Sequence, residues 1–209
     1  FTANGRQMSK ILIDPSNTNN LLVATSAGIF RSIDAGITFA NVQAGSFKDL
    51  EMKPGTPTTY YASGTEVYRS TNSGVSWSKI SSGLPAASAV SRLAIAVTPA
   101  NADVVYVLAA IVAPDYGFQG LYKSINGGTS FTKVTVSSPG NILGWDSNGG
   151  DSGGQGWYDL GFAASPTNAN EVTTGGVNVW RSTNGGSSFS LNGHWTGSGA
   201  PYVHADVHE

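Results

Sequence analysis

The side chains best suited to chemistry gather near the end of this 209-residue chain. His204, Asp206 and His208 alternate, so on a β-strand they would share one face. Imidazole and carboxylate groups in such a row suit a metal site or an acid–base cluster. The alternative is a set of polar side chains that hydrogen-bond to one another. Asp159 and Asp206 are the candidates for a catalytic pair of carboxylates.

A second group of possible metal ligands lies in the segment that Asp146 and Asp151 bracket. Its oxygen atoms and glycines have spacings that a calcium loop can use, although the helix-flanked pattern ending in Glu is absent. A solvated glycine-rich loop is the alternative interpretation. We expect that no cofactor is required, and Ca²⁺ is an ion that this loop could hold.

Aromatic residues form the third group. Flat rings beside amide and carboxylate acceptors suit sugars, because the C–H faces of a sugar stack while its hydroxyls take hydrogen bonds. Trp145 and Trp195 stand among Gly, Ser and Asn and are expected at the surface, whereas Trp157 and Tyr158 either bind a ligand or begin a buried strand. The candidate ligand-binding residues are Tyr116, Phe118, Trp145, Trp157, Tyr158 and Trp195.

A repeated element must position these residues. Four eight-residue boxes fit the pattern S-x-[DN]-x-G-x-[ST]-[FW] and start 38, 54 and 58 residues apart. Such a period matches a four-stranded propeller blade with loops of variable length. The boxes are defined by Ser32, Asp34, Gly36 and Phe39; Ser70, Asn72, Gly74 and Trp77; Ser124, Asn126, Gly128 and Phe131; and Ser182, Asn184, Gly186 and Phe189.

The residue types of the box indicate a structural role. The glycine is expected at a positive φ, and the aromatic residue is expected to pack between sheets. The third position is Asp in the first box and Asn in the other three. Because Asn keeps the hydrogen-bond acceptor and loses the charge, this position serves hydrogen bonding and not acid catalysis or tight metal binding.

The sequence therefore predicts an all-β fold, a β-propeller of four-stranded antiparallel blades in a single domain over residues 1–209. The blades are expected over 6–43, 46–81, 90–136 and 156–191, and residues 202–209 are expected to begin the first strand of a fifth. Because an unclosed propeller exposes sheet edges, we expect a larger propeller, seven-bladed, with further blades from the same or another chain.

Strand direction indicates where function lies. Strands alternate in direction along a blade, so the box turns and the turns between first and second strands share one face. The long loops over 111–120, 137–156 and 192–201 then emerge on the opposite face. Long loops on a rigid scaffold are where binding usually occurs.

The composition argues against several partners. The chain has 11 Lys and Arg against 13 Asp and Glu, for a net charge of −2. Nucleic acids and anionic membrane surfaces call for clustered basic residues, so we expect neither partner. The chain has no cysteine and no apolar run of about 18 residues that would span a membrane.

The boxes resemble the Asp-box, or bacterial neuraminidase, repeat. That resemblance implies a propeller of the sialidase, sortilin or xyloglucanase type. Residues 155–160, 175–182 and 202–208 are similar to segments of large secreted Bacteroidetes proteins, which carry such propellers beside adhesion domains and secretion signals. An extracellular or cell-surface location is implied.

These observations favour a binding or adhesion module for polysaccharide or a surface glycan. A sialidase needs an arginine cluster, but Arg31, Arg69 and Arg181 occupy the repeat position before a box, and only Arg6 and Arg92 lie outside that frame. A xyloglucanase-like glycoside hydrolase with paired carboxylates ranks second. A protein-binding propeller also remains open.

Overall fold

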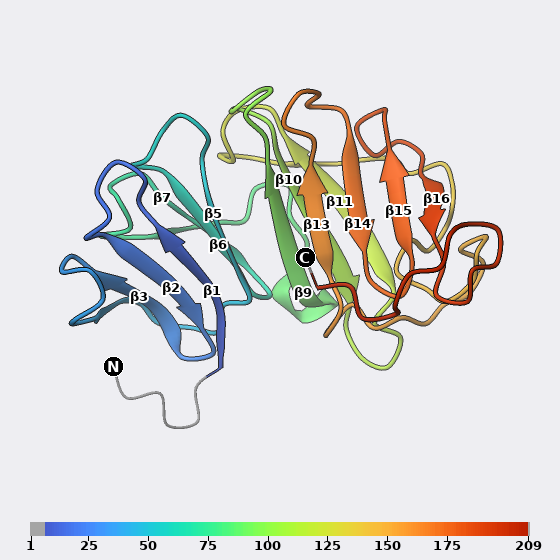
Figure 1. Cartoon of the computed structure of the whole chain (residues 1–209), viewed down its shortest axis with the longest axis horizontal. Helices are drawn as coiled ribbons and strands as arrows, with labels where there is room; N and C mark the ends of the chain where they lie inside the picture. Colours follow the sequence, from blue (N-terminus) through green and yellow to red (C-terminus); the bar gives the residue numbers. More distant parts are fainter. Residues whose placement is uncertain (1–6, 209) are drawn as a thin grey trace.

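The computed structural model describes residues 7–208, which form four antiparallel four-stranded sheets, each with its strands in chain order (Figure 1). The strands of the first two sheets are β1 (Met8–Ile13), β2 (Leu21–Thr25), β3 (Gly28–Ser32) and β4 (Ala40–Gln43), then β5 (Asp49–Met52), β6 (Tyr60–Ser63), β7 (Val67–Ser70) and β8 (Ser78–Ile80). The others are β9 (Val90–Val97), β10 (Val105–Ile111), β11 (Phe118–Ser124) and β12 (Thr132–Lys133), then β13 (Gly161–Ala164), β14 (Val172–Gly175), β15 (Val179–Ser182) and β16 (Ser190–Gly193). Arg6 and residue 209 lie outside the described residues.

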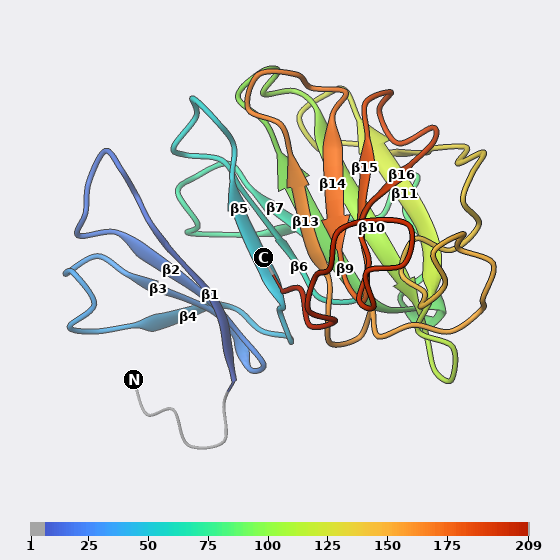
Figure 2. The same cartoon turned by 45° about the vertical axis from the view of Figure 1, so that its right-hand side comes forward.

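The sheets are arranged as successive blades. β1 contacts β5, β5 contacts β9 and β9 contacts β13, so the first strands of the blades form one inner row. Figure 2 shows the sheets fanning outward from this row. This is the arrangement of a β-propeller, and the predicted fold class is confirmed.

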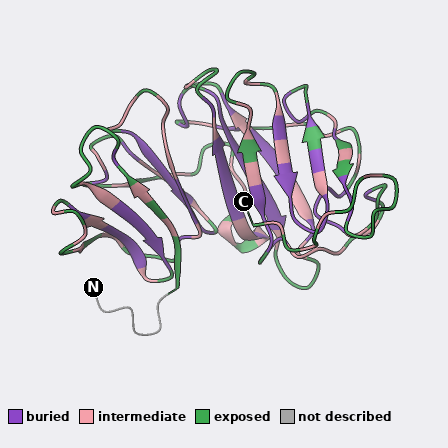
Figure 3. Cartoon of the chain, viewed as in Figure 1, coloured by how far each residue is buried: buried purple, intermediate pink, exposed green. Residues whose placement is uncertain are grey.

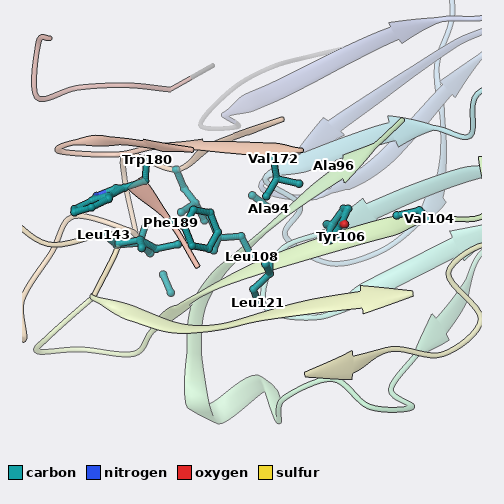
Figure 4. Packing of buried hydrophobic residues seen from close by; sticks show 13 residues of the cluster. Ala94, Ala96, Val104, Tyr106, Leu108, Leu121, Leu143, Val172, Trp180 and Phe189 are labelled. Carbon is teal, nitrogen blue, oxygen red and sulfur yellow. The ribbon is translucent and has the colours of Figure 1, made fainter. Parts of the chain in front are cut away.

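Apolar side chains hold the blades together in pairs. Strand β10 shows how, because it is buried on both faces. Val105 and Val107 pack toward the second blade, whereas Tyr106 and Leu108 pack toward the fourth. Because successive side chains point to opposite faces of the sheet, the single strand β10 contributes to two different cores. Figure 4 shows the second of these, where Leu108 and Leu121 lie with side chains of the fourth blade.

Burial follows the same division. Three clusters of buried apolar residues lie between blades one and two, two and three, and three and four. In Figure 3 the buried residues concentrate on these facing strands, whereas β1 is largely exposed. Met8, Ile11 and Ile13 of β1 are 54–55 % exposed. The first blade therefore presents apolar side chains to solvent.

The four boxes share one hydrogen-bond network. In each, the Ser hydroxyl donates to the Asp or Asn at 2.7–3.0 Å and accepts the N–H of the box glycine at 2.9–3.0 Å. The same Asp or Asn oxygen accepts the N–H four residues on at 2.9–3.1 Å. Asp34 accepts the Thr38 hydroxyl at 2.6 Å, whereas the Asn residues donate to a Ser there. Acid and amide therefore make equivalent turns.

Two consecutive residues of each box have left-handed backbone conformations. The glycine has φ between +74° and +88°, and the preceding residue, Ala35, Ser73, Gly127 or Gly185, has φ between +58° and +72°. The sequence pattern does not identify this earlier position, because Ala and Ser occupy it in two boxes. Asn and Gly are the usual residues at positive φ.

The box glycine also makes the contact between blades. In the last three boxes a Cβ on the glycine would lie 2.0–2.7 Å from a side chain of the preceding blade. The pairs are Gly74 with Leu22, Gly128 with Tyr61 and Gly186 with Leu121. Each box also donates a backbone N–H to the turn between the first two strands of its own blade, at 2.6–3.0 Å. The boxes and these turns therefore share one face.

Some segments differ from the expected strands. The outer strand of the blade expected over 90–136 is reduced to the two residues of β12, and β13 begins four residues after Trp157. Residues 202–208 form no strand, and Tyr202 makes an isolated bridge with His194. A first strand hydrogen-bonds to the second strand of its own blade, and within residues 7–208 no such strand follows. In the same part of the chain, no helix has the length and apolar character to cross a membrane.

We expect Gly186→Ala to lower the free energy of unfolding by about 2–4 kcal/mol. About 1 kcal/mol comes from placing a Cβ at positive φ, and the rest from the clash with Leu121. Urea denaturation measures both. Gly55→Ala is the matched control, because Gly55 also has positive φ, but no described atom beyond its chain neighbours lies within 4 Å of the place that its Cβ would take. Equal losses in the two variants would show that the blade contact contributes nothing.

Candidate functional site

The inner row of strands forms the wall of a groove of about 1230 Å³. Residues of β1, β5, β9 and β13 line it, together with residues of β14 and β15 in the fourth blade and with Gln7, Lys48, Trp157, Tyr158, Val207 and His208. The first strands come together because each begins a blade, and the blades pack face to face. The groove is thus a direct product of the repeat.

One side of the groove carries a compact charge network. Lys10 of β1 lies 3.2 Å from Asp49 and 2.5 Å from Glu51, both on β5. Burial lowers the pKa of Lys10, but the two carboxylates raise it by more, so its net pKa is raised. Asp49 also accepts the N–H groups of Leu50 at 2.8 Å and Ile95 at 2.7 Å. Asp49 therefore ties three blades together.

The opposite side holds a buried carboxylate. Asp159 is 0 % exposed, and within residues 7–208 neither of its oxygens has a hydrogen-bond partner. The Nε2 atom of His208 lies 3.5 Å from its Oδ1. Arg92 of β9 acts on the same carboxylate by charge and donates from Nη1 to the carbonyl of Tyr158. Arg92 is the one described arginine that does not occupy the repeat position before a box. This departure from the repeat is what marks Arg92 in the sequence.

Asp159 has a strongly shifted pKa. Burial and the nearby charge of Asp206 raise its pKa to about 6, against the opposing charges of His208, Arg92 and His204. Asp206 is exposed and His204 Nδ1 lies 3.5 Å from its Oδ2. The two carboxylates predicted as a catalytic pair therefore lie near each other. Only Asp206 is open to solvent, however, and Asp159 does not reach the groove surface.

Aromatic rings form a continuous run along this side. Tyr116 and Trp157 have ring centroids 6.1 Å apart, Trp157 and Tyr158 5.4 Å, and Tyr158 and His208 4.8 Å. Trp157 is 53 % exposed and Tyr158 50 % exposed. Gln155 accepts the N–H groups of residues 158 and 159, both at 2.8 Å, so these rings stand on a turn. The interpretation that they begin a buried strand is wrong.

Tyr116 contributes a second feature of this run. Its φ is +55°, a left-handed conformation that is costly for a tyrosine. Its carbonyl accepts the N–H of Gly156 at 3.1 Å, and a Cβ on Gly156 would lie 2.9 Å from that oxygen. The strained residue thus joins the loop after β10 to the turn that carries Trp157.

Trp145 and Trp195 form a separate pair. Their centroids are 5.6 Å apart with an interplanar angle of 81°, and the Trp195 indole donates to the Trp145 carbonyl at 3.1 Å. Trp195 is 38 % exposed and Trp145 is half-buried. Asn178 donates to the same carbonyl at 3.2 Å, and His194 Nε2 lies 3.2 Å from it. This pair braces two loops and offers less free ring surface than Trp157 and Tyr158.

The other residues that the sequence proposed for a site include Phe118, Asp146 and Asp151. Phe118 begins β11 and packs half-buried against the core between blades three and four. Asp151 accepts the N–H groups of Trp145 at 2.6 Å and Asp146 at 3.4 Å, so its oxygens close the loop. Across residues 7–208, no group of three or more His, Cys, Asp and Glu side chains is placed to hold a metal ion.

Asn141 is a site-building residue that the sequence did not single out. Its amide donates to two carbonyls of the same loop, at 3.0 and 2.9 Å, and its oxygen accepts the N–H groups of Phe118 and Leu143 at 2.9 and 3.1 Å. One buried amide therefore folds the loop over 137–156. An Asn after a Pro-Gly pair resembles many turn residues, so its sequence context gave no signal.

The final segment runs back toward the groove. Val207 donates its N–H to Gly176 at 3.2 Å, and a Cβ on Gly175 would lie 2.3 Å from Val207 Cγ1. In Figure 1 this segment crosses the end of the fourth sheet, and the C-terminal end lies in front of β9 and β13. His208 thus reaches Asp159, although residues 203–208 belong to no strand.

The inner row of strands and the groove define a β-propeller. Its solved structural neighbours include an ancestral GH74 enzyme with a TM-score of 0.63 and 21 % identity, over 88 % of this chain and 24 % of that one. A GH74 xyloglucanase from Xanthomonas campestris has a TM-score of 0.66 and 18 % identity, over 88 % and 30 %. A protein of unknown function from Bacteroides thetaiotaomicron has a TM-score of 0.55 and 12 % identity, over 90 % and 44 %.

These similarities establish the fold alone. The chain spans less than a third of the length of either GH74 structure. No protein-family model matches the sequence, and a comparison with curated proteins finds no match.

The raised pKa of Asp159 predicts that the stability of the folded chain depends on pH. Because its pKa is higher in the folded chain than the ordinary 3.8, folding favours the protonated acid. Its contribution to stability is complete below about pH 4 and is lost as the pH rises through about 6. Between pH 4 and pH 7, Asp159→Asn should therefore gain up to about 3 kcal/mol relative to the native chain. Denaturant unfolding at both pH values measures this, and a difference between Asp159→Asn and the native chain that is the same at pH 4 and pH 7 would contradict it.

Proposed function

We propose that this propeller binds polysaccharide or a surface glycan through the groove and its aromatic rim. The observation that carries the proposal is the exposed pair Trp157 and Tyr158, with Tyr116 beside them, at the edge of the groove. Rings of this size contribute large apolar contact area, and two adjacent rings can stack on successive sugar residues. The charged groups of the groove offer hydrogen bonds to hydroxyls.

The shape of the groove supports a chain-like ligand. Its volume exceeds the range of about 300–1000 Å³ that is usual for small-molecule pockets. It is lined by residues from all four blades, so a ligand can contact several blades at once. The name of one structural neighbour, a xyloglucanase, is in keeping with a polysaccharide ligand. An extracellular or cell-surface location fits such a ligand and is part of the proposal.

Trp157→Ala should weaken binding to a soluble polysaccharide at least about tenfold, because a lost stacking contact costs roughly 1.5–3 kcal/mol. Affinity electrophoresis against a panel of neutral and acidic polysaccharides first identifies a ligand, and calorimetry then measures the loss. Tyr202→Ala is the matched control, since Tyr202 is 69 % exposed and does not line the groove. Equal losses in both variants, or no ligand in the panel, would contradict the proposal.

A glycoside hydrolase is the second candidate. The raised pKa of Asp159 and the proximity of Asp206 favour it, since inverting and retaining enzymes both use a carboxyl pair. The complete burial of Asp159 opposes it, because the acid must contact the glycosidic oxygen. Release of reducing ends from β-glucans, abolished in Asp206→Asn, would place this function first.

A protein ligand is the third candidate, because exposed tryptophan and tyrosine also serve protein interfaces. A glycan panel without binders, together with a protein captured through Trp157, would favour the protein ligand.

We further propose that additional blades, from the same or another chain, pack against the first blade. The exposed Ile11 and Ile13 support this, since neighbouring blades cover the equivalent faces elsewhere.

A further inference from the structure

The groove is lined by charged side chains that its aromatic rim does not explain. Apart from His208, the described lining includes three basic residues, Lys10, Lys48 and Arg92, and one acidic residue, Asp49. The chain as a whole has the opposite balance, with 11 basic residues against 13 acidic ones. The lining therefore has a basic excess, and its meaning depends on which of these groups can still bind a ligand.

The acidic side chain of the lining already has its partners. Asp49 is 9 % exposed, and it accepts the N–H groups of Leu50 at 2.8 Å and Ile95 at 2.7 Å. It also pairs with Lys10 at 3.2 Å, and Lys10 pairs with Glu51 at 2.5 Å. These groups satisfy one another, so neither Asp49 nor Lys10 decides what the groove binds.

The other two cations keep donors for a ligand. Lys48 Nζ lies 3.4 Å from the neutral amide oxygen of Gln7, and within residues 7–208 neither Lys48 nor Arg92 forms an ion pair with a carboxylate. A guanidinium has five N–H donors. In Arg92, Nη1 donates to the Tyr158 carbonyl, and Nε has no hydrogen-bond partner in the described chain. Most of the fork is thus unused.

Buried carboxylates stand near Arg92 without filling the groove. The charges of Asp49 and Asp159 act on Arg92, but Asp159 is 0 % exposed and Asp49 is nearly buried. They offset part of the positive charge, so long-range attraction of an anion is weak. Selection of a ligand must therefore come from direct contact with the donors of Arg92 and Lys48.

Arg92 is attached to the aromatic rim. It donates to the carbonyl of Tyr158, whose ring is half-exposed and lies 5.4 Å from that of Trp157. All three residues line the groove. The planar fork of an arginine matches a carboxylate in a bidentate manner. Stacking surface and carboxylate-binding donors thus lie in one part of the groove.

We propose that the groove selects acidic polysaccharides, with Arg92 and Lys48 binding the carboxylates of uronic acid residues while Trp157 and Tyr158 stack on the sugar rings. This inference rests on the proposed glycan-binding function and adds the charge of the ligand. A neutral sugar uses the stacking surface but offers the two cations only hydroxyl groups. Hydrogen bonds to an ionised acceptor are roughly twice as strong as those to a neutral one.

The test uses two acidic polymers, polygalacturonate and alginate, each beside a carboxyl-reduced form that keeps the backbone and loses the charge. Affinity electrophoresis and calorimetry on the full chain measure binding of all four. We expect at least one acidic polymer to bind about tenfold or more tightly than its reduced form. This preference should fall as NaCl is added, because salt screens charge interactions.

Variants assign the preference to the two cations. Arg92→Gln should remove most of it, and Arg92→Lys, which keeps the charge without the fork, should retain part. Lys48→Gln should weaken binding of the acidic form severalfold and leave the reduced form unaffected. Arg181→Gln is the matched control, because Arg181 is exposed, pairs with Glu171 and does not line the groove.

The outcomes separate this inference from the function on which it rests. Equal affinity for acidic and reduced forms, lost in Trp157→Ala, overturns charge selection and leaves glycan binding in place. Failure of every polysaccharide to bind contradicts both. If Arg92→Gln weakens both forms by the same factor, Arg92 only supports the rim and the proposal is wrong. Should that variant fail to fold, an unchanged preference in Lys48→Gln counts against the proposal.

Discussion

The whole molecule depends on the contact between a box glycine and the preceding blade. At Gly74, Gly128 and Gly186 a side chain from the neighbouring sheet occupies the space that a Cβ would need. The Ser hydroxyl that accepts the glycine N–H fixes the turn, so backbone geometry and blade packing are set by the same few atoms. These contacts lie on the box face, so they limit how closely successive blades approach there. The first strands of the same blades contact one another in the inner row.

Once the inner row is fixed, the groove and its charges follow. Asp49 accepts N–H groups from its own strand and from β9 and also pairs with Lys10 of β1. A carboxylate with these partners is well compensated in a buried setting. Asp159, at the other side, is equally buried and, within the described chain, has no such donors. Asp49 is thus compensated by hydrogen bonds and a lysine, whereas Asp159 relies on the charges around it, including that of His208, whose Nε2 lies 3.5 Å away.

Much of the fold could be predicted from the sequence, because the box repeats in one frame and each strand has a period of two. The predicted all-β propeller, its four-stranded sheets and its loop-bearing face agree with the structure. The prediction failed where tertiary hydrogen bonds outweigh local pattern. Trp157 belongs to an apolar run typical of a strand, but the Gln155 carbonyl accepts two N–H groups and turns the chain. Residues 202–208 have strand alternation, but the described chain offers them no strand to pair with.

The candidate site was only partly predictable for the same reason. The aromatic and acidic residues are visible in the sequence, but their grouping depends on Asn141, which folds the loop over 137–156, and on Asn178, which holds Trp145. Through the left-handed Tyr116, this loop positions the turn that carries both the exposed rings and the buried Asp159. Rings and carboxylate therefore share one support. A change that loosens the loop must disturb the groove rim and the acidic cluster together, whereas a change at a box acts on both only by altering the packing of the blades.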